Sequence, residues 1–376
     1  MSITVCLSAS AIDRPKAGGH LWVYMNWALG LRALGGRVIW LETVPPGRPA
    51  DEVQAGVATL KSRLERYGLA DCVALCSSTP EPLSQSSTEG CLDFEVAAAE
   101  ADLLLNMRYA MPSGQVECFR RSALVDIDPG LLQVWMSRGQ INVAPHDAYF
   151  TTGETVGRQG ARFPDVGLEW QYTPPCVALE WWPRRAVERA PFTTVTHWRM
   201  RQWVEDAGEV YRNDKRTGFL PFLDLPQHTT RPLELALCLT SHEDEERVNL
   251  QQRGWRVRDA YAELTTPADY QSYIQNSLGE FSCAKPSCTR LQNAWVSDRT
   301  LCYLASGKPA VVQHTGPSRL LPDFAGLFRF RDVEEAARCL ETAASDYKRQ
   351  CGFARALAEE HFDARKVVGR VLERAA

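Results

Sequence analysis

The chain alternates short apolar runs with amphipathic helical segments, and this alternation constrains its fold more than any other feature. In the first half the apolar runs lie at 3–8, 38–41, 72–76, 103–106, 123–127 and 148–151, and helical patterns lie at 22–34 and 53–67. Strands that alternate with helices form a parallel sheet with helices on both faces. The first half is therefore predicted to be one doubly wound α/β unit.

A turn-rich passage interrupts the alternation near the middle of the chain. It contains Thr173-Pro174-Pro175 and, further on, the run from Trp181 to Arg185. Proline restricts its own backbone and that of the residue before it, so such a passage seldom continues a helix or a strand. We place the junction between two domains there, between 179 and 192.

A second series of the same kind follows the junction, with predicted strands at 193–196, 233–239, 255–258, 310–313 and 327–330. Asp332 and Glu335 form a capping box in front of an apolar stripe at 336–344, and a last helix is predicted at 363–375. The chain thus divides into two Rossmann-like halves. The predicted bounds are 1–180 for an N-terminal domain, 190–355 for a C-terminal domain and 356–376 for closing helices.

Length and charge narrow the possible functions. The 376 residues fit two domains, at roughly 150 residues per domain. Lysine and arginine number 42 against 46 acidic residues, so the chain lacks the positive field of proteins that bind nucleic acids or membrane surfaces without specificity. No stretch approaches the roughly 18 apolar residues of a membrane span, and the apolar run within 1–14 is too short for a secretion signal. We expect a cytoplasmic protein with no nucleic-acid partner.

The twelve cysteines give no sign of a metal site. They include no C-x-x-C pair, and the closest pairs, Cys72/Cys76 and Cys283/Cys288, lack nearby histidines at zinc-site spacing. We expect reduced thiols and no structural metal.

Gly18 and Gly19 lie between the first predicted strand and an apolar helix. Glycine lets a backbone approach a ligand closely, and a helix N-terminus offers free N–H groups to an anion. The dinucleotide fingerprint G-x-G-x-x-G is absent, which argues against a nicotinamide cofactor. We expect Gly18 and Gly19 to hold a diphosphate, with a plain tight turn as the alternative.

The second half offers polar and cationic groups at predicted strand ends, at helix starts and in a polar loop at 280–285. Ligands of doubly wound sheets bind at the carboxyl ends of the strands. Taken singly, each group could be a helix cap or a solvated charge; as a set they favour an anionic ligand, because cations neutralise a leaving diphosphate. The candidate donor-binding residues are Arg199, Lys215, Glu280, Lys285, Ser297, Asp298, Arg299, Thr300, His314, Thr315 and Gly316.

His146 and Asp147 precede the predicted strand at 148–151, and Glu154 follows it. A histidine beside a carboxylate at a strand end can act as a base or hold sugar hydroxyls, or it can simply satisfy a local hydrogen bond. Our first candidate for a catalytic residue on the acceptor side is His146, with Asp147 and Glu154 next.

Asp126 and Asp128 form a D-x-D motif, which elsewhere can hold a divalent metal on the phosphates of a sugar nucleotide. Here the motif ends a predicted strand and runs directly into Pro129-Gly130. We therefore favour a turn with capping carboxylates and predict no catalytic metal.

Over nearly its whole length the sequence resembles a bacterial family of GT-B glycosyltransferases, most strongly over 270–330. The resemblance implies two Rossmann-like domains that face a central cleft, with a nucleotide pocket lined mainly by the second domain. The segments that carry it are 18–20, 126–129, 146–147, 152–154, 277–282 with Lys285, 295–300, 303–309, 313–316 and 356–363.

Carried over residue by residue, the resemblance places Arg199 and Lys215 at the diphosphate, 297–300 near phosphate or ribose, and 314–316 near the sugar. Many retaining relatives have a glutamate for the donor ribose where this chain has Cys302. The resemblance therefore leaves the stereochemical outcome open.

The expected function is transfer of a hexose-like unit from a nucleoside-diphosphate sugar, bound as co-substrate, to a small-molecule acceptor held by the first domain. No metal or other cofactor is expected, and specialised metabolism is one compatible setting. Two alternatives remain. One is a sugar-nucleotide epimerase of the same shape, which needs no acceptor, and the other is a non-catalytic nucleotide-sugar-binding protein.

Overall fold

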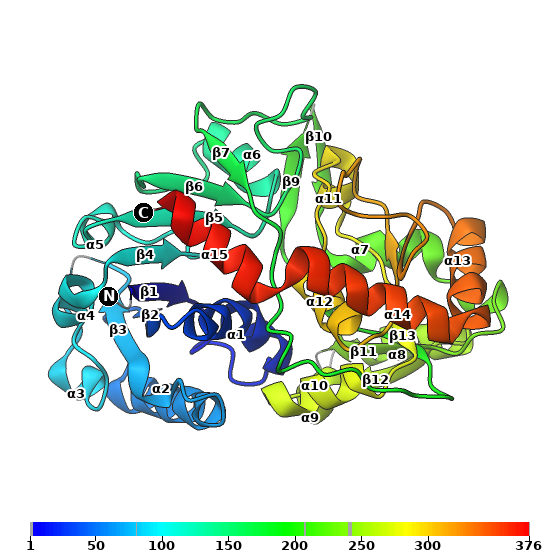
Figure 1. The fold of residues 1–376 in the computed structure, drawn as a ribbon, viewed down its shortest axis with the longest axis horizontal. Coiled ribbons are helices and arrows are strands. Elements are labelled where there is room, and N and C mark those ends of the chain that lie inside the picture. The colour runs from blue at the N-terminus through cyan, green and yellow to red at the C-terminus, as the bar shows by residue number, and fades with distance from the viewer. Residues whose placement is uncertain (1–2, 80, 207, 240–242, 376) are drawn as a thin grey trace.

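The computed structural model describes residues 3–79, 81–206, 208–239 and 243–375. Two parallel sheets lie side by side, one in each half of the chain (Figure 1). The N-terminal sheet has the order β3-β2-β1-β4-β5-β6-β7. Its strands are β1 (Thr4–Ala9), β2 (Arg37–Val44), β3 (Val73–Ser77), β4 (Leu103–Asn106), β5 (Ser122–Asp126), β6 (Ala148–Thr151) and β7 (Trp170–Tyr172).

The C-terminal sheet has the order β12-β11-β8-β13-β14-β15, and all its pairings are parallel. Its strands are β8 (Phe192–His197), β11 (Leu233–Cys238), β12 (Arg256–Asp259), β13 (Gly279–Ser282), β14 (Ala310–Gln313) and β15 (Leu327–Phe330). A separate antiparallel hairpin is formed by β9 (Trp203–Asp206) and β10 (Glu209–Arg212). The prediction of two doubly wound halves is confirmed.

Helices cover the faces of both sheets, as parallel strands with apolar residues on both sides require. In the N-terminal half they are α1 (Gly18–Ala33), α2 (Ala50–Glu65), α3 (Gln85–Thr88), α4 (Phe94–Glu100), α5 (Ser113–Val116) and α6 (Leu131–Ser137). In the C-terminal half they are α7 (Lys215–Phe219), α8 (Asp244–Gln252), α9 (Ala260–Glu263), α10 (Pro267–Gln275), α11 (Pro286–Leu291), α12 (Asp298–Ala305), α13 (Val333–Ser345) and α14 (Tyr347–Leu357). No helix in the described part of the chain is long and apolar enough to cross a membrane.

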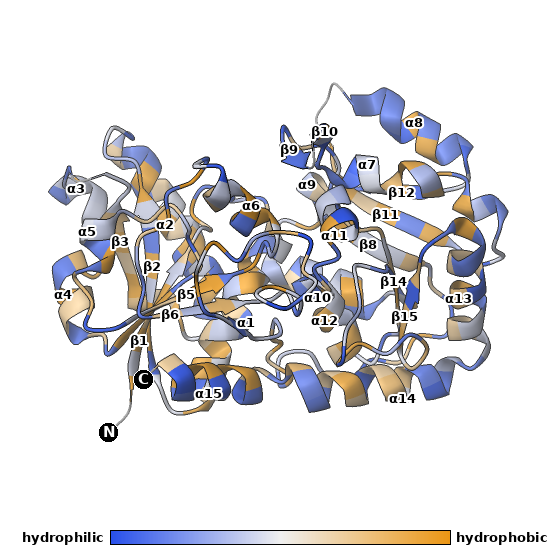
Figure 2. Cartoon of the chain, turned by 90° about the horizontal axis from the view of Figure 1, so that it is seen from above, coloured by the Kyte–Doolittle hydropathy of each residue, from blue (hydrophilic) through white to orange (hydrophobic). Residues whose placement is uncertain are grey.

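The last helix, α15 (Ala364–Ala375), returns to the N-terminal half and packs on α1. Figure 2 shows α14 and α15 end to end along one side of both halves. A β-bridge fixes the crossing, since Val177 N donates to the carbonyl of Phe362 at 2.8 Å and Ala364 N donates to that of Val177 at 3.0 Å. The C-terminus thus ties the two halves together.

One apolar core runs through both halves. It includes Trp22 of α1, Trp182 of the connecting segment and Tyr270 of α10, all nearly or fully buried. Their rings meet at centroid distances of 4.6 Å for Trp22 with Trp182 and 6.3 Å for Trp182 with Tyr270. The two sheets are therefore held against each other by buried side chains.

The segment 280–285, predicted to be a polar loop, instead begins as part of β13, a central strand between β8 and β14. Its polar residue Glu280 is fully buried and is paired there with Arg299 of α12. The short strand β7 and the β9–β10 hairpin were not predicted from the sequence either.

Candidate functional site

A cleft of about 1000 Å³ lies between the two halves. Its walls include the loops after β1 and β4 in the N-terminal sheet and those after β8 and β13 in the C-terminal sheet. In each sheet those two strands are neighbours at the point where the strand order reverses. Such a switch point, at the carboxyl ends of the strands, is where doubly wound sheets bind ligands.

The cleft brings together part of the predicted donor-binding set. Residues that line it are Gly18, Gly19, Lys215, Lys285, Ser297, Asp298 and Arg299. The remaining predicted residues are not among its lining: Arg199, Glu280, Thr300, His314, Thr315, Gly316, His146, Asp147 and Glu154.

Lys215 opens α7, directly after the N-cap Asp214, and only 8 % of its surface is exposed. Its Nζ donates to the carbonyl of Cys283 at 2.6 Å and lies 5.7 Å from the centre of the Trp295 ring. Burial, followed by the neighbouring charge of Arg299, lowers the pKa of Lys215 to about 7. The cleft therefore contains an ammonium group that titrates near neutral pH.

Arg299 lies in the first turn of α12, after the N-cap Ser297. Its Nε donates to Glu280 Oε1 at 2.8 Å and its Nη1 donates to the carbonyl of Val195 at 3.0 Å. Burial acts against the charge, but the buried carboxylate of Glu280 holds the pKa of Arg299 above its usual value. Nη2 is buried without a hydrogen-bond partner among the described residues, so one donor of this cleft residue remains for a ligand.

Lys285 stands just before α11, on the same wall of the cleft. Its Nζ has one long hydrogen bond, 3.4 Å to Gln202 Oε1. Lys215, Lys285 and Arg299 thus place three cationic side chains on the C-terminal wall.

Arg199, predicted to face a diphosphate, points to α8 instead. Its guanidinium forms ion pairs with Glu246 at 2.7 Å and with Glu243 at 3.2 Å. Arg216 also donates to Glu246, at 2.9 Å. Because these carboxylates neutralise Arg199 outside the cleft, its predicted role is not supported by its position.

The predicted triplet 314–316 follows β14 and contacts the segment that carries Trp295. Thr315 Oγ1 donates to the carbonyl of Trp295 at 2.7 Å, and Ala294 N donates to the carbonyl of Thr315 at 3.0 Å. At Gly316 the backbone has φ 137°, and a Cβ would lie 2.5 Å from the carbonyl oxygen of Gln292. These residues position Trp295, which lines the cleft.

Gly18 and Gly19 begin α1 and are needed for contact between the two halves. A Cβ on Gly18 would lie 2.2 Å from the carbonyl oxygen of Thr266, and one on Gly19 would lie 2.4 Å from the ring of Tyr270. Both residues also line the cleft. Glycine is required here because the backbone of α1 lies close to Thr266 and Tyr270 of the other half.

His20 follows them and is held in one tautomer. Its Nε2 lies 2.7 Å from the carbonyl of Ser10, so this nitrogen carries the proton and donates it. Burial, then the nearby cation of Arg14, lowers the pKa of His20 to about 4. The ring is therefore neutral at pH 7 and keeps Nδ1 as an acceptor.

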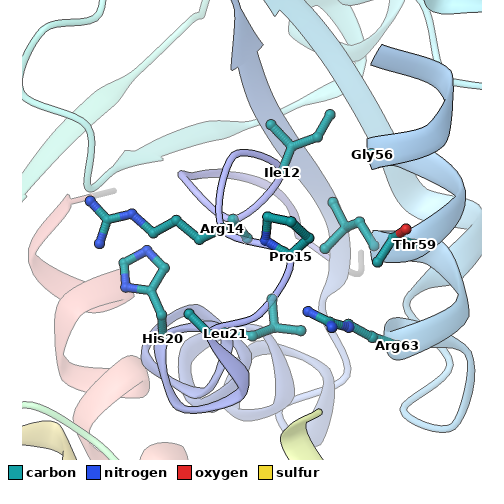
Figure 3. Close-up of a pocket in the computed structure, with 11 residues that line it drawn as sticks. Ile12, Arg14, Pro15, His20, Leu21, Gly56, Thr59 and Arg63 are labelled. Atoms are coloured by element: carbon teal, nitrogen blue, oxygen red, sulfur yellow. The ribbon is translucent and has the colours of Figure 1, made fainter. Parts of the chain in front are cut away.

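A second, small cavity of about 10 Å³ lies beside the loop after β1, with space for about one water molecule. It shares Arg14, Pro15, Ala17 and His20 with the large cleft. Figure 3 shows Arg14 and His20 on one side of Pro15, with Thr59 and Arg63 of the α2 region on the other. The cavity is too small to hold a substrate.

The D-x-D motif at the end of β5 divides into a buried and a cleft-facing carboxylate. Asp126 is fully buried and accepts hydrogen bonds from Gln133 Nε2 at 2.9 Å and from Thr151 Oγ1 at 2.8 Å. Burial raises the pKa of Asp126 to about 7. Asp128 lines the cleft. Among the described residues no group of three or more histidine, cysteine, aspartate or glutamate side chains could hold a metal ion.

The predicted acceptor-side residues serve local structure. His146 Nδ1 donates to the carbonyl of Ala144 at 2.7 Å, which leaves Nε2 to accept from Asn106 Nδ2 at 3.1 Å. Both ring nitrogens are thus occupied. Asp147 accepts from the N–H of Ser122 at 2.7 Å. Their positions outside the cleft lining do not support a catalytic role.

Glu154, the third acceptor-side candidate, connects the two halves. It accepts from Ser318 Oγ at 2.5 Å and from the N–H of Arg319 at 2.9 Å. Because its carboxylate is used in this contact and lies outside the cleft lining, it too is not supported as a catalytic group.

Some cleft residues were not singled out from the sequence. Arg108 follows β4 and Arg14 follows β1, so both stand at the carboxyl ends of switch-point strands. That rule alone could have found them. The buried Glu42 shapes the loop after β1 by accepting hydrogen bonds from the N–H groups of Ala11 and Ile12 at 2.9 and 3.2 Å.

No protein-family model matches the sequence, and no curated protein matches it. Solved structures do match over the full length. HepE from Anabaena, in complex with UDP-glucose, has 13 % identity over 99 % of both chains and a TM-score of 0.60. An alpha-glucosyltransferase in complex with UDP-glucose and DNA containing an abasic site has 10 % identity over 100 % of both chains and a TM-score of 0.55.

A third neighbour is AviGT4, a glycosyltransferase involved in avilamycin A biosynthesis, with 12 % identity over 99 % of this chain and 97 % of that one and a TM-score of 0.54. Together with the two doubly wound sheets and the cleft between them, these likenesses settle the architecture. The chain has the GT-B fold of glycosyltransferases.

Proposed function

We propose that this protein transfers a sugar from a nucleoside-diphosphate sugar to a small-molecule acceptor. The observation that carries the proposal is the cationic C-terminal wall of the cleft. Lys215, Lys285 and Arg299 face a cleft formed at the switch points of both sheets. Cations fixed where negative charge develops are a main source of catalysis when a diphosphate leaves.

The donor is proposed to be a UDP-hexose. The HepE structures contain UDP, UDP-glucose, or UDP and glucose, and the alpha-glucosyltransferase structure contains UDP-glucose. Since both share the fold of this chain, their ligands suggest which nucleotide sugars to test first.

In this proposal Arg299 offers its unpaired Nη2 and Lys215 its ammonium to the diphosphate, while Lys285 adds a third positive charge. Such electrostatic stabilisation of a leaving group is worth several kcal/mol, about 2.7–4 kcal/mol for a single well-placed donor. The N-terminal wall, with Tyr24, Trp27 and Arg108, is left for the acceptor.

The test is a thermal-shift panel of UDP, UDP-glucose and other nucleotides and nucleotide sugars, with and without a chelator. A ligand at 100 times its Kd stabilises the fold by about 2.7 kcal/mol, so binding raises the Tm. We expect a UDP-sugar to raise the Tm equally with the chelator. No shift with any compound of the panel would overturn the proposal.

A variant with a matched control locates the site. Lys285→Ala removes one cleft cation with few internal contacts and should weaken UDP-glucose binding at least about tenfold, because a hydrogen bond to a charged group is worth about 1.5–3 kcal/mol. Lys348→Ala changes an exposed lysine on α14 and should leave the Kd unchanged. Equal affinities in both variants would place the donor elsewhere.

Product analysis separates the rival functions. An epimerase converts the donor with no acceptor present, whereas a binding protein leaves it unchanged with or without acceptors. A transferase releases the nucleotide as the sugar appears on the acceptor.

A further inference from the structure

Resting on the proposed function, we propose that Asp128 is the catalytic carboxylate that takes the proton from the acceptor hydroxyl. The candidate acceptor-side residues predicted from the sequence do not line the cleft, whereas Asp128 does. Asp128 stands two residues beyond the end of β5, on the wall opposite the three cations.

The loop that carries Asp128 touches the opposite wall. The carbonyl of the next residue, Pro129, accepts from Asn293 Nδ2 at 2.7 Å. A Cβ on Gly130 would lie 3.1 Å from Leu291 Cδ1. Asn293 is two residues before Trp295, the ring that neighbours Lys215. Asp128 therefore stands where acceptor and donor walls meet.

Tyr109 holds this carboxylate in place. Its hydroxyl oxygen accepts from the N–H groups of Ile127 at 2.8 Å and Asp128 at 2.9 Å. With its oxygen so engaged, the hydroxyl proton is directed to a carboxylate, and Asp126 Oδ1 and Asp128 Oδ2 both lie 3.4 Å away. The loop backbone and the carboxylate are thus held by one half-buried phenol.

The two aspartates have different surroundings. The carboxylate of Asp126 accepts hydrogen bonds from Gln133, Thr151 and the N–H of Asp128, so both of its oxygens are used inside the protein. Asp128 is partly exposed, and no lysine or arginine in the described part of the chain forms an ion pair with it. It is a carboxylate without an ion-pair partner among the described residues, and it faces the cleft that Lys215, Lys285 and Arg299 also line.

Asp13 and His20 also line this wall. Asp13 pairs with Arg48, and the surroundings of His20 disfavour the role of proton acceptor. A proton on Nδ1 would create a cation beside Arg14, a neighbour that already disfavours the charged ring. Asp128, by contrast, lines the cleft and has no ion-pair partner among the described residues.

The acceptor oxygen forms a bond to the anomeric carbon while its proton passes to a carboxylate oxygen of Asp128. The bond from the anomeric carbon to the phosphate oxygen breaks, and its electron pair stays on the diphosphate, facing Lys215 and Arg299. The proton on Asp128 returns to solvent when the products leave.

The experiment compares Asp128→Asn with wild type. Calorimetry measures the Kd for UDP-glucose, or for the nucleotide sugar that gives the largest thermal shift. A coupled assay measures nucleotide release with water and with a panel of sugars, polyols and phenols as acceptors. Asp51→Asn, an exposed carboxylate on α2, is the control, and the Tm of each variant shows that it is folded.

We expect Asp128→Asn to lose at least about 100-fold in nucleotide release, within the usual range for a general base, with the donor Kd changed less than about threefold. Asp51→Asn should match wild type. Asp128→Asn turning over at more than a third of the wild-type rate would overturn the inference, and so would loss of donor binding in place of turnover.

Failure of the proposed function gives a different pattern. A wild-type chain that binds no nucleotide sugar contradicts the transferase itself, and the inference falls with it. A wild-type chain that binds the donor but releases no nucleotide with water or any acceptor overturns the catalytic role of Asp128 while leaving donor binding intact.

Discussion

Burial gives the cations of the cleft different protonation behaviour. Lys215 donates a hydrogen bond to the carbonyl of Cys283, whereas Arg299 is paired with the carboxylate of Glu280. A guanidinium keeps its proton in a protein, while a buried lysine readily releases it. The C-terminal wall therefore combines a permanent charge with one that depends on pH.

We expect the affinity for UDP-glucose to fall as the pH rises above about 7, the lowered pKa of Lys215. Only the protonated ammonium attracts the diphosphate, whose own charge is constant over this range. Calorimetry between pH 6 and 9 measures the effect, and Lys215→Met should bind more weakly with a flat profile. A wild-type affinity independent of pH would contradict this role of Lys215.

The same pKa has a separate consequence for stability. Between the lowered folded value of about 7 and the ordinary value of 10.5, the unfolded chain binds more protons at Lys215 than the folded chain. The free energy of unfolding contributed by this group therefore rises with pH across that window. Affinity and stability are thus expected to change in opposite directions.

Local sequence does not show which residues reach the cleft, because this depends on ion pairs and hydrogen bonds between distant residues. Lys215 and Arg299 were predicted at the site and do line it. Arg199 has the same charge, yet Glu246, 47 residues further along, draws it away to α8. His146 looked like a base, but its hydrogen bond with Asn106 spans 40 residues. Such contacts exist only once the chain is folded.

At the scale of elements, strands with continuous apolar runs were predictable, whereas the central strand β13 was missed. β1 and β4 are buried throughout and were found from their apolar residues. β13 contains Glu280 and Ser282 and was taken for a loop. Its burial depends on Arg299 of α12, so the strand becomes recognisable only with its ion-pair partner in view.

The contact between α1 and α10 is expected to tolerate no side chain at position 19. A Cβ there would lie 2.4 Å from the Tyr270 ring. Overpacking of this kind costs about 1–3 kcal/mol, so Gly19→Ala should lower the free energy of unfolding by that amount. Denaturant unfolding measures it.

Gly352→Ala is the matched control for that substitution. Gly352 lies within α14 and nothing stands within 4 Å of its added Cβ. Replacing a helical glycine by alanine should stabilise by about 0.5–1 kcal/mol. If both variants shift stability in the same direction, the contact between α1 and α10 is not as tight as the backbone indicates.

At the scale of the whole molecule, the two halves were predictable but their shared core was not. Hydrophobic periodicity describes each element separately, and it cannot say that Trp22 meets Trp182 across the junction. Nor does it show that α15 returns to α1. The fold class follows from the order of elements, whereas the rigidity of the cleft follows from contacts between distant segments.

Because one apolar core spans both halves, we expect the chain to unfold in a single calorimetric transition. Trp182 is fully buried between Trp22 and Tyr270, so Trp182→Ala should cost about 3–5 kcal/mol and separate the transition into two. Trp203→Ala is the control, since that ring is 59 % exposed on the β9–β10 hairpin. Two transitions already in the wild type would mean that the halves are independent and that the cleft can open freely. One transition in both variants would mean that other contacts, such as α15 on α1, suffice to couple the two walls.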